Sequence, residues 1–221
     1  MKVALLLAGY GNVARRFVTL LDESRRPLGA MGIEPVIVGV VTRRHGAVFD
    51  WAGLDANRIA RTFAEGGAVG RASVPSTLEW IARLRSQDVE ARVLVETTTL
   101  DIRSGEPAIS HVRAAFAAGA HVITANKGPA AFAYRALTDE ARQAGVSFLF
   151  EGAVMDGIPI FNLVRETLPA CDIRGFRGVV NSTTNFIITA MEHGGERLWI
   201  GIPVRGGVLD GLGKVERYGG K

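Results

Sequence analysis

The sequence predicts an α/β fold, in which a doubly wound, mostly parallel sheet is followed by an incomplete α+β domain. Short apolar or β-branched runs alternate with helical stretches over the first two-thirds of the chain. A glycine-rich turn stands directly between the first apolar run and the first helical stretch. We therefore expect one doubly wound domain over residues 1–130 and a partial second domain over residues 131–221.

The expected strands are almost continuous apolar runs, as strands buried on both faces should be. They are residues 3–7, 36–41, 93–95, 121–124 and 146–150. The expected helices carry apolar residues at helical spacing and span 12–22, 77–85, 108–118 and 134–144. Gly119 and Gly145 stand where glycines commonly end helices. Further on we expect a helix near 158–167, a strand near 176–180 and a helix from Asn185.

Composition excludes several classes of protein. The 221 residues are 48% hydrophobic, with 26 Lys and Arg against 22 Asp and Glu, which excludes intrinsic disorder. The single cysteine, Cys171, excludes an internal disulfide and favours a reducing cytoplasm. The pI is about 9.6, but the basic residues are scattered, so we expect no nucleic-acid partner. No apolar run approaches the ~18 residues that span a bilayer, so we expect no membrane partner.

The turn Gly9-Tyr10-Gly11-Asn12-Val13-Ala14 has the GxGxxA spacing of a pyrophosphate-binding turn. The first glycine permits a tight turn, and the second lets the backbone approach the phosphates. The N-terminus of the following helix supplies N–H groups and positive potential. The residues from Gly9 to Val13 are therefore expected to bind a dinucleotide in a Rossmann-like domain. The alternative is an ordinary glycine-rich turn.

Two further strand ends carry polar residues. Where NAD sites usually place an acidic residue, this chain has Arg43 and Arg44, whose planar guanidinium groups suit a 2′-phosphate, so NADP(H) is favoured over NAD(H). The alternative is a solvated basic loop.

Thr97 and Thr98 close the strand that begins at Arg92 and are expected to line the nicotinamide ribose. Their alternative role is turn formation.

The chain resembles the homoserine dehydrogenase family in four segments that stand in the family's order. They are residues 9–13, the TANKGP segment at 124–129, residues 150–159 and residues 180–186. The resemblance implies an NAD(P)-dependent enzyme that interconverts L-aspartate 4-semialdehyde and L-homoserine, on the route to threonine, methionine and isoleucine. It also implies a homodimer.

The resemblance implies several site residues. Lys127, at the end of a buried strand, would lie at both the cofactor and the active site and serve in catalysis. A monovalent cation, usually sodium, would be held by Glu151, Val154, Asp156 and Ile158. The family's commoner version of this loop is richer in glycine, and the alternative here is an irregular loop that caps the next helix.

The segment that begins at Asn181 offers neutral hydrogen-bonding groups before a helix, as a site for a small polar amino acid requires. Asn181, Ser182 and Thr183 are therefore expected to bind substrate. Helix capping is the alternative role for this cluster.

From about residue 196 the sequence departs from the family, and the acidic segment and second lysine that the family would place there are not recognisable. We therefore expect a C-terminally truncated or atypical member. One alternative is a catalytically silent NADP-binding relative that lacks the distal part of the active site. Another is a different dehydrogenase of a small amino or keto acid, because a nucleotide-binding fold is shared by many activities.

Overall fold

The computed structural model describes residues 1–70, 76–86, 89–155, 157–175, 177–178, 185–186, 188–189, 192, 198–200 and 215–217. The chain divides into two compact units, Met1–Thr167 and Leu168–Lys221. Among the described residues, none of the helices has the length and apolarity that crossing a bilayer requires.

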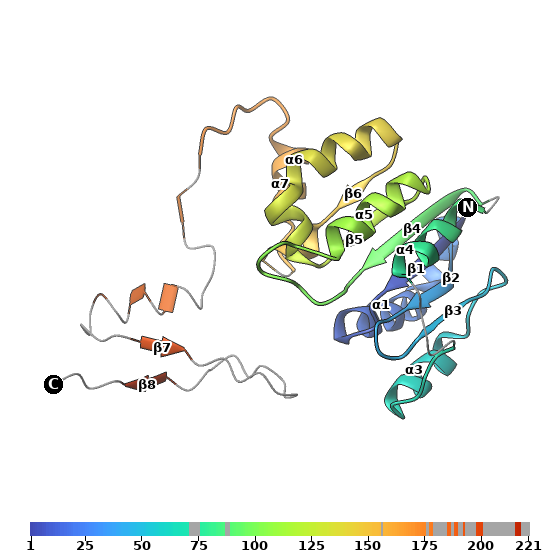
Figure 1. Ribbon diagram of the computed structural model, residues 1–221. Helices are drawn as coiled ribbons and strands as arrows, with labels where there is room; N and C mark the ends of the chain where they lie inside the picture. The colour runs from blue at the N-terminus through green and yellow to red at the C-terminus, as the bar shows by residue number, and fades with distance from the viewer. Residues whose placement is uncertain are drawn as a thin grey trace. The chain divides into compact units, whose positions relative to one another are not determined.

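A six-stranded sheet forms the centre of the first unit, in the order β3-β2-β1-β4-β5-β6 (Figure 1). All neighbouring strands are parallel except β3, which pairs antiparallel with β2. The strands are β1 (Lys2–Ala8), β2 (Glu34–Val41), β3 (Ala47–Phe49), β4 (Ala91–Glu96), β5 (His121–Thr124) and β6 (Phe148–Leu149). The predicted α/β class with a mostly parallel sheet is confirmed.

Helices cover both faces of this sheet, as a doubly wound fold requires. On one face, Leu5 and Leu7 of β1 share a buried apolar cluster with helices α1 (Asn12–Glu23) and α3 (Ala56–Ala64). On the other, Leu6 shares a cluster with α4 (Thr77–Ala82), α5 (Ala108–Ala117) and α6 (Lys127–Ala144). Figure 1 shows α5 and α6 side by side.

The remaining elements of the first unit are short. Helix α2 (Arg25–Ala30) follows α1, and the 3₁₀ turn η1 (Arg83–Ser86) continues α4. A second 3₁₀ turn, η2 (Glu151–Ala153), precedes helix α7 (Ile160–Thr167). Gly119 and Gly145 follow helices with positive φ angles of 67° and 66°, so their predicted role as helix ends is confirmed.

Helix α6 begins at Lys127, not at the predicted residue 134. The side chain of Asn126 caps the helix, and Pro129 lies in the first turn, where no intrahelical N–H is needed. A non-helical Ala133, with φ −138° and ψ 20°, interrupts the helix and its apolar periodicity. The proline and this interruption explain why the sequence pattern predicted only the part of α6 that follows Ala133. Helices α2 and α3 and strand β3 were not predicted either.

In the second unit, strand β7 (Leu198–Ile200) pairs antiparallel with β8 (Val215–Arg217). The sequence did not predict this pair. The predicted strand near 176–180 and the predicted helix from Asn185 lie mostly outside the described residues.

Candidate functional site

Polar and glycine-rich turns gather at the carboxyl ends of the central strands. Strand β1 lies between β2 and β4, which is the point where the strand order reverses and where open α/β sheets bind ligands. The N–H of Gly9 donates to the carbonyl of Val41 at 2.9 Å, and the N–H of Thr97 donates to that of Ala8 at 2.8 Å. These bonds join the turns that follow β1 and β4 at the edge where β2 also ends.

The two glycines of the first turn have different surroundings. Gly9 has φ +89°, and a Cβ there would lie 2.7 Å from the carbonyl oxygen of Thr97. Gly11 is the N-cap of α1, no side chain caps this terminus, and a Cβ on Gly11 would meet no atom within 4 Å. The first amides of α1 therefore have no side-chain cap, and an uncapped helix N-terminus beside open space can bind a phosphate.

The side chain of Tyr10 points into the core instead of toward that space. It is 5% exposed, and its ring centroid lies 4.3 Å from that of Phe63 on α3. Burial raises the pKa of the Tyr10 phenol, and Arg15 opposes this shift. By contrast, Asn12 and Val13 are exposed at the start of α1. Tyr10 thus anchors the turn and leaves the backbone to contact a ligand.

Arg43 and Arg44 lie in the turn that follows β2. The hydroxyl of Thr42 closes this turn, accepting from the N–H of His45 at 2.9 Å and donating to the carbonyl of Gly46 at 3.0 Å. Both arginines are exposed, and neither forms a salt bridge with another residue in the described part of the chain. They are free to contact an anion beside the end of β2.

Thr97 and Thr98 are half-buried, and both hydroxyls donate within the protein. That of Thr97 donates to the carbonyl of Ala8 at 3.2 Å, and that of Thr98 donates to the carboxylate of Glu96. Each hydroxyl oxygen keeps lone pairs for an incoming donor. The structure therefore gives both threonines a role in shaping the turn and leaves each able to accept a hydrogen bond.

Lys127 is the first residue of α6 and is exposed. The preceding Asn126 fixes its position, because the Oδ1 atom accepts from the N–H of Gly128 at 2.9 Å and the Nδ2 atom donates to the carbonyl of Thr98 at 3.1 Å. The segment that carries Lys127 is thus bound directly to the Thr98 turn.

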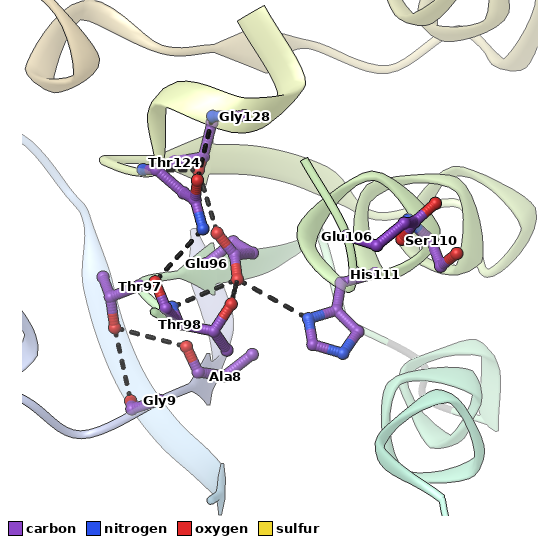
Figure 2. A network of polar contacts seen from close by, with 11 residues as sticks. Ala8, Gly9, Glu96, Thr97, Thr98, Glu106, Ser110, His111, Thr124 and Gly128 are labelled. Atoms are coloured by element: carbon purple, nitrogen blue, oxygen red, sulfur yellow. Dashed lines mark hydrogen bonds and ion pairs between the residues drawn. The ribbon is translucent and has the colours of Figure 1, made fainter. Parts of the chain in front are cut away.

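A buried carboxylate lies beneath these turns (Figure 2). Glu96 is 0% exposed, accepts from the hydroxyl of Thr124 at 3.1 Å and from the N–H of Thr98 at 3.1 Å, and lies 3.5 Å from the Nδ1 atom of His111. We had not singled out this group from the sequence. The available signals were a glutamate at the end of an apolar strand and a histidine on the apolar face of α5.

In the loop predicted to bind a cation, the side chain of Glu151 caps helix α7. The carboxylate of Glu151 accepts from the N–H of Phe161 at 2.8 Å and from that of Asn162 at 3.1 Å, in the first turn of α7. The carbonyl of Ile158 accepts from Ile160 at 2.8 Å, and Val154 is half-buried. Among the described residues no cluster of three His, Cys, Asp or Glu side chains could hold a metal ion. These contacts favour the capping role of Glu151.

Four predicted site residues lie outside the described residues. They are Asp156, Asn181, Ser182 and Thr183.

Two protein-family models match this chain. The model described as "Homoserine dehydrogenase, NAD binding domain" matches residues 9–151, and the model described as "Homoserine dehydrogenase" matches residues 159–199. The fold and the glycine turn define a nicotinamide-nucleotide-binding domain. With the first model covering well over half of its residues, the chain belongs to the homoserine dehydrogenase family.

Relatives and solved structures agree with this assignment. The NAD(+)-dependent homoserine dehydrogenase of Pseudomonas canavaninivorans is 38% identical over 86% of this chain and 54% of its own length. Homoserine dehydrogenase from Thermoplasma acidophilum has a TM-score of 0.69 and 26% identity, over 88% of this chain and 57% of its own. A hyperthermophilic archaeal homoserine dehydrogenase in complex with NADPH has a TM-score of 0.67 and 27% identity, with the same coverage. The chain thus spans just over half the length of each of these three relatives.

Proposed function

We propose that this chain carries the cofactor half, and part of the substrate half, of a homoserine dehydrogenase. The reaction is the NAD(P)-dependent interconversion of L-aspartate 4-semialdehyde and L-homoserine. One observation carries the proposal. The glycine turn, the Thr98 turn and Lys127 follow β1, β4 and β5, so all three lie at the carboxyl edge of adjacent parallel strands.

Each part has a role in this proposal. The open amides after Gly11 bind the pyrophosphate, and the Thr97 and Thr98 turn lies where the nicotinamide ribose would contact it. A bound nicotinamide supplies or accepts the hydride. The ammonium of Lys127 neutralises negative charge beside the reacting oxygen and holds a proton there. Asn181, Ser182 and Thr183 are proposed to bind the polar groups of the amino acid.

The first measurement is NADP⁺ reduction by the 221-residue protein with L-homoserine, followed by nicotinamide absorbance. We expect turnover that falls by a factor of about 10² or more in Lys127→Ala. Arg135→Ala, an exposed cation further along α6, is the control and should keep wild-type activity. A second candidate is a catalytically silent NADP-binding relative, because the family's acidic segment and second lysine are not recognisable in the sequence from about residue 196. Tight NADPH binding without turnover would favour that candidate.

We further propose a preference for NADP(H) over NAD(H), supported by the two exposed arginines after β2. The relative from Pseudomonas canavaninivorans is named as NAD(+)-dependent, so the preference must be tested on this chain itself. The double variant Arg43→Ala, Arg44→Ala should weaken NADPH binding about tenfold or more and leave NADH binding unchanged. The double variant Arg25→Ala, Arg26→Ala in α2 loses the same charge before the amino end of β2 and should change neither. Equal affinities of the wild type for the two cofactors would exclude the preference.

The remaining expectations belong to the same proposal. The sodium ion that the resemblance implies at Glu151, Val154, Asp156 and Ile158 is the alternative to the capping role of Glu151, and turnover that is higher in sodium chloride than in choline chloride at equal ionic strength would favour the ion. A homodimer predicts twice the chain mass by light scattering. We also propose a cytoplasmic location, which suits an exposed, unpaired Cys171.

A further inference from the structure

Glu96 is held in a closed ring of hydrogen bonds. Its carboxylate accepts from the hydroxyl of Thr124 at 3.1 Å, and that hydroxyl oxygen accepts from the N–H of Asn126 at 3.0 Å. The Nδ2 atom of Asn126 donates to the carbonyl of Thr98 at 3.1 Å, and the N–H of Thr98 returns to Glu96 at 3.1 Å. We call these four residues the Glu96 ring. Figure 2 shows the bonds from Thr98 and Thr124 meeting at the Glu96 carboxylate.

A buried carboxylate is costly unless hydrogen bonds satisfy it, so its presence at this strand end requires a reason. The ring joins the end of β4 to the start of α6, two segments that the sheet alone leaves connected only through β5. Since Asn126 also caps α6 through the N–H of Gly128, the ring determines where the helix begins. Lys127 lies between Asn126 and Gly128, so the ring also fixes the position of its backbone.

The ring acts on one half of the proposed cofactor site. It contains Thr98 and adjoins Lys127, the two groups placed beside the nicotinamide. None of its four members belongs to the glycine turn or to the turn that carries Arg43 and Arg44, which would hold the phosphates. Loss of the ring should therefore disturb the nicotinamide half and spare the half that binds the adenine nucleotide.

We propose that Glu96 is a positioning residue that sets the Thr98 turn and the first turn of α6 against the nicotinamide. The proposal rests on the proposed function, because it presumes that a nicotinamide dinucleotide binds at this edge of the sheet. The plainer possibility is that the ring only stabilises the fold. A positioning role predicts that changes in the ring weaken only the binding of ligands that contain the nicotinamide half. A purely structural role predicts that they weaken the binding of both kinds of ligand equally.

The experiment compares two ligands on the full 221-residue chain by titration calorimetry. NADPH contains the nicotinamide and its ribose, whereas 2′-phospho-ADP has the same adenine nucleotide half with neither of them. If the chain does not prefer the 2′-phosphate, NADH and ADP make the same comparison. Glu96→Gln and Thr124→Val are shape-conserving changes in the ring, and Thr124→Ser restores the hydroxyl. Val112→Ala, in the buried core on α5, is the control for general destabilisation.

We expect Thr124→Val and Glu96→Gln to raise the Kd for NADPH about five- to tenfold and to leave the Kd for the fragment within about twofold. Thr124→Ser should bind NADPH like the wild type, and Val112→Ala should lower the melting temperature without changing either Kd. Unchanged NADPH binding in both ring variants, or equal weakening of both ligands, would overturn the positioning role while leaving the proposed function standing. If the wild type binds neither pair of ligands, the proposed function fails, and the inference fails with it.

Discussion

At the scale of single residues, the two glycines of the first turn are required for different reasons. Gly9 is required by the fold for two reasons. Its φ of +89° is strained for other residues, and a Cβ at this position would lie 2.7 Å from the carbonyl oxygen of Thr97. Gly11 is not required by the fold, since its φ of −80° suits any residue and its surroundings are open. A glycine at position 11 is therefore explained by a ligand that approaches the backbone there, not by packing within the protein.

This difference predicts opposite effects of two alanine substitutions. Gly9→Ala should lower the free energy of unfolding by about 1–3 kcal/mol, because the substitution combines a strained φ with a backbone clash. Gly11→Ala should leave stability within about 0.5 kcal/mol of the wild type and raise the Kd for NADPH at least about tenfold. Urea denaturation and calorimetric titration measure the two quantities. Full-strength NADPH binding by Gly11→Ala would show that the phosphates do not approach this residue.

The phenol of Tyr10 predicts a dependence of stability on alkaline pH. Burial raises the pKa of Tyr10 above its ordinary value of 10.0, so the folded state favours the protonated phenol. As pH rises beyond 10, the unfolded chain ionises first, and the folded state loses stability until the raised pKa is passed. Tyr10→Phe keeps the ring beside Phe63 and should lose less stability than the wild type between about pH 9.5 and 11. Parallel losses in both proteins would contradict this role for the phenol.

Residue identities predicted which short motifs lie at this edge of the sheet, but not the contacts that join them. The glycine spacing and the paired arginines are local patterns, and a short window of sequence contains them. The Glu96 ring depends on the register of β4 against β5, which places Glu96 beside Thr124 although 28 positions separate them. Periodicity within one strand carries no information on that register, so the ring could not be derived from the sequence.

At the scale of elements, Glu151 shows how a side chain distant in sequence can begin a helix. Its carboxylate accepts from the second and third residues of α7, Phe161 and Asn162, which lie ten and eleven positions further along the chain. A negative charge is favourable there because it faces the positive end of the helix dipole. These bonds therefore join η2 to the first turn of α7.

The capping role predicts a local loss of protection in Glu151→Ala. Removing a cap costs about 1 kcal/mol, which corresponds to roughly fivefold faster hydrogen exchange at Phe161 and Asn162. Glu166→Ala removes a carboxylate of the same helix that pairs with the exposed Arg165, and it should leave both amides unchanged. The rates should be the same in sodium and choline chloride. Slower exchange in sodium alone would instead indicate an ion at Glu151.

The sequence predicted the elements whose apolar pattern is continuous and missed those whose pattern is short or interrupted. Strand β5 was predicted to the residue, and β1, β2, β4 and α5 within a few residues, because each is buried and apolar. Strand β3 has three residues and lies at the sheet edge, so no periodicity could reveal it. Helix α3 is capped by Asp55, a signal that was present but stood apart from any recognised strand.

At the scale of the whole molecule, the parts proposed to bind the cofactor all lie in one compact unit. The glycine turn, the arginine turn, the Thr98 turn and Lys127 belong to Met1–Thr167, and the carboxyl ends of four strands bring them to one edge. The residues proposed for substrate binding lie in Leu168–Lys221, beyond this unit. Cofactor binding and turnover should therefore depend on different portions of the chain.

This division predicts that residues 1–167 alone bind NADPH with a Kd within about twofold of the 221-residue chain, measured by calorimetry. A ligand that binds only the folded state at 100 times its Kd adds about 2.7 kcal/mol of stability, so NADPH should raise the melting temperature of both chains alike. L-homoserine alone should not raise that of the shorter chain, which lacks Asn181, Ser182 and Thr183. Gly11→Ala in the shorter chain is the control, because it should abolish the NADPH shift without unfolding the protein. Loss of NADPH binding on removal of residues 168–221 would mean that the second unit completes the cofactor site, and the nucleotide-binding role assigned to the first unit alone would be wrong.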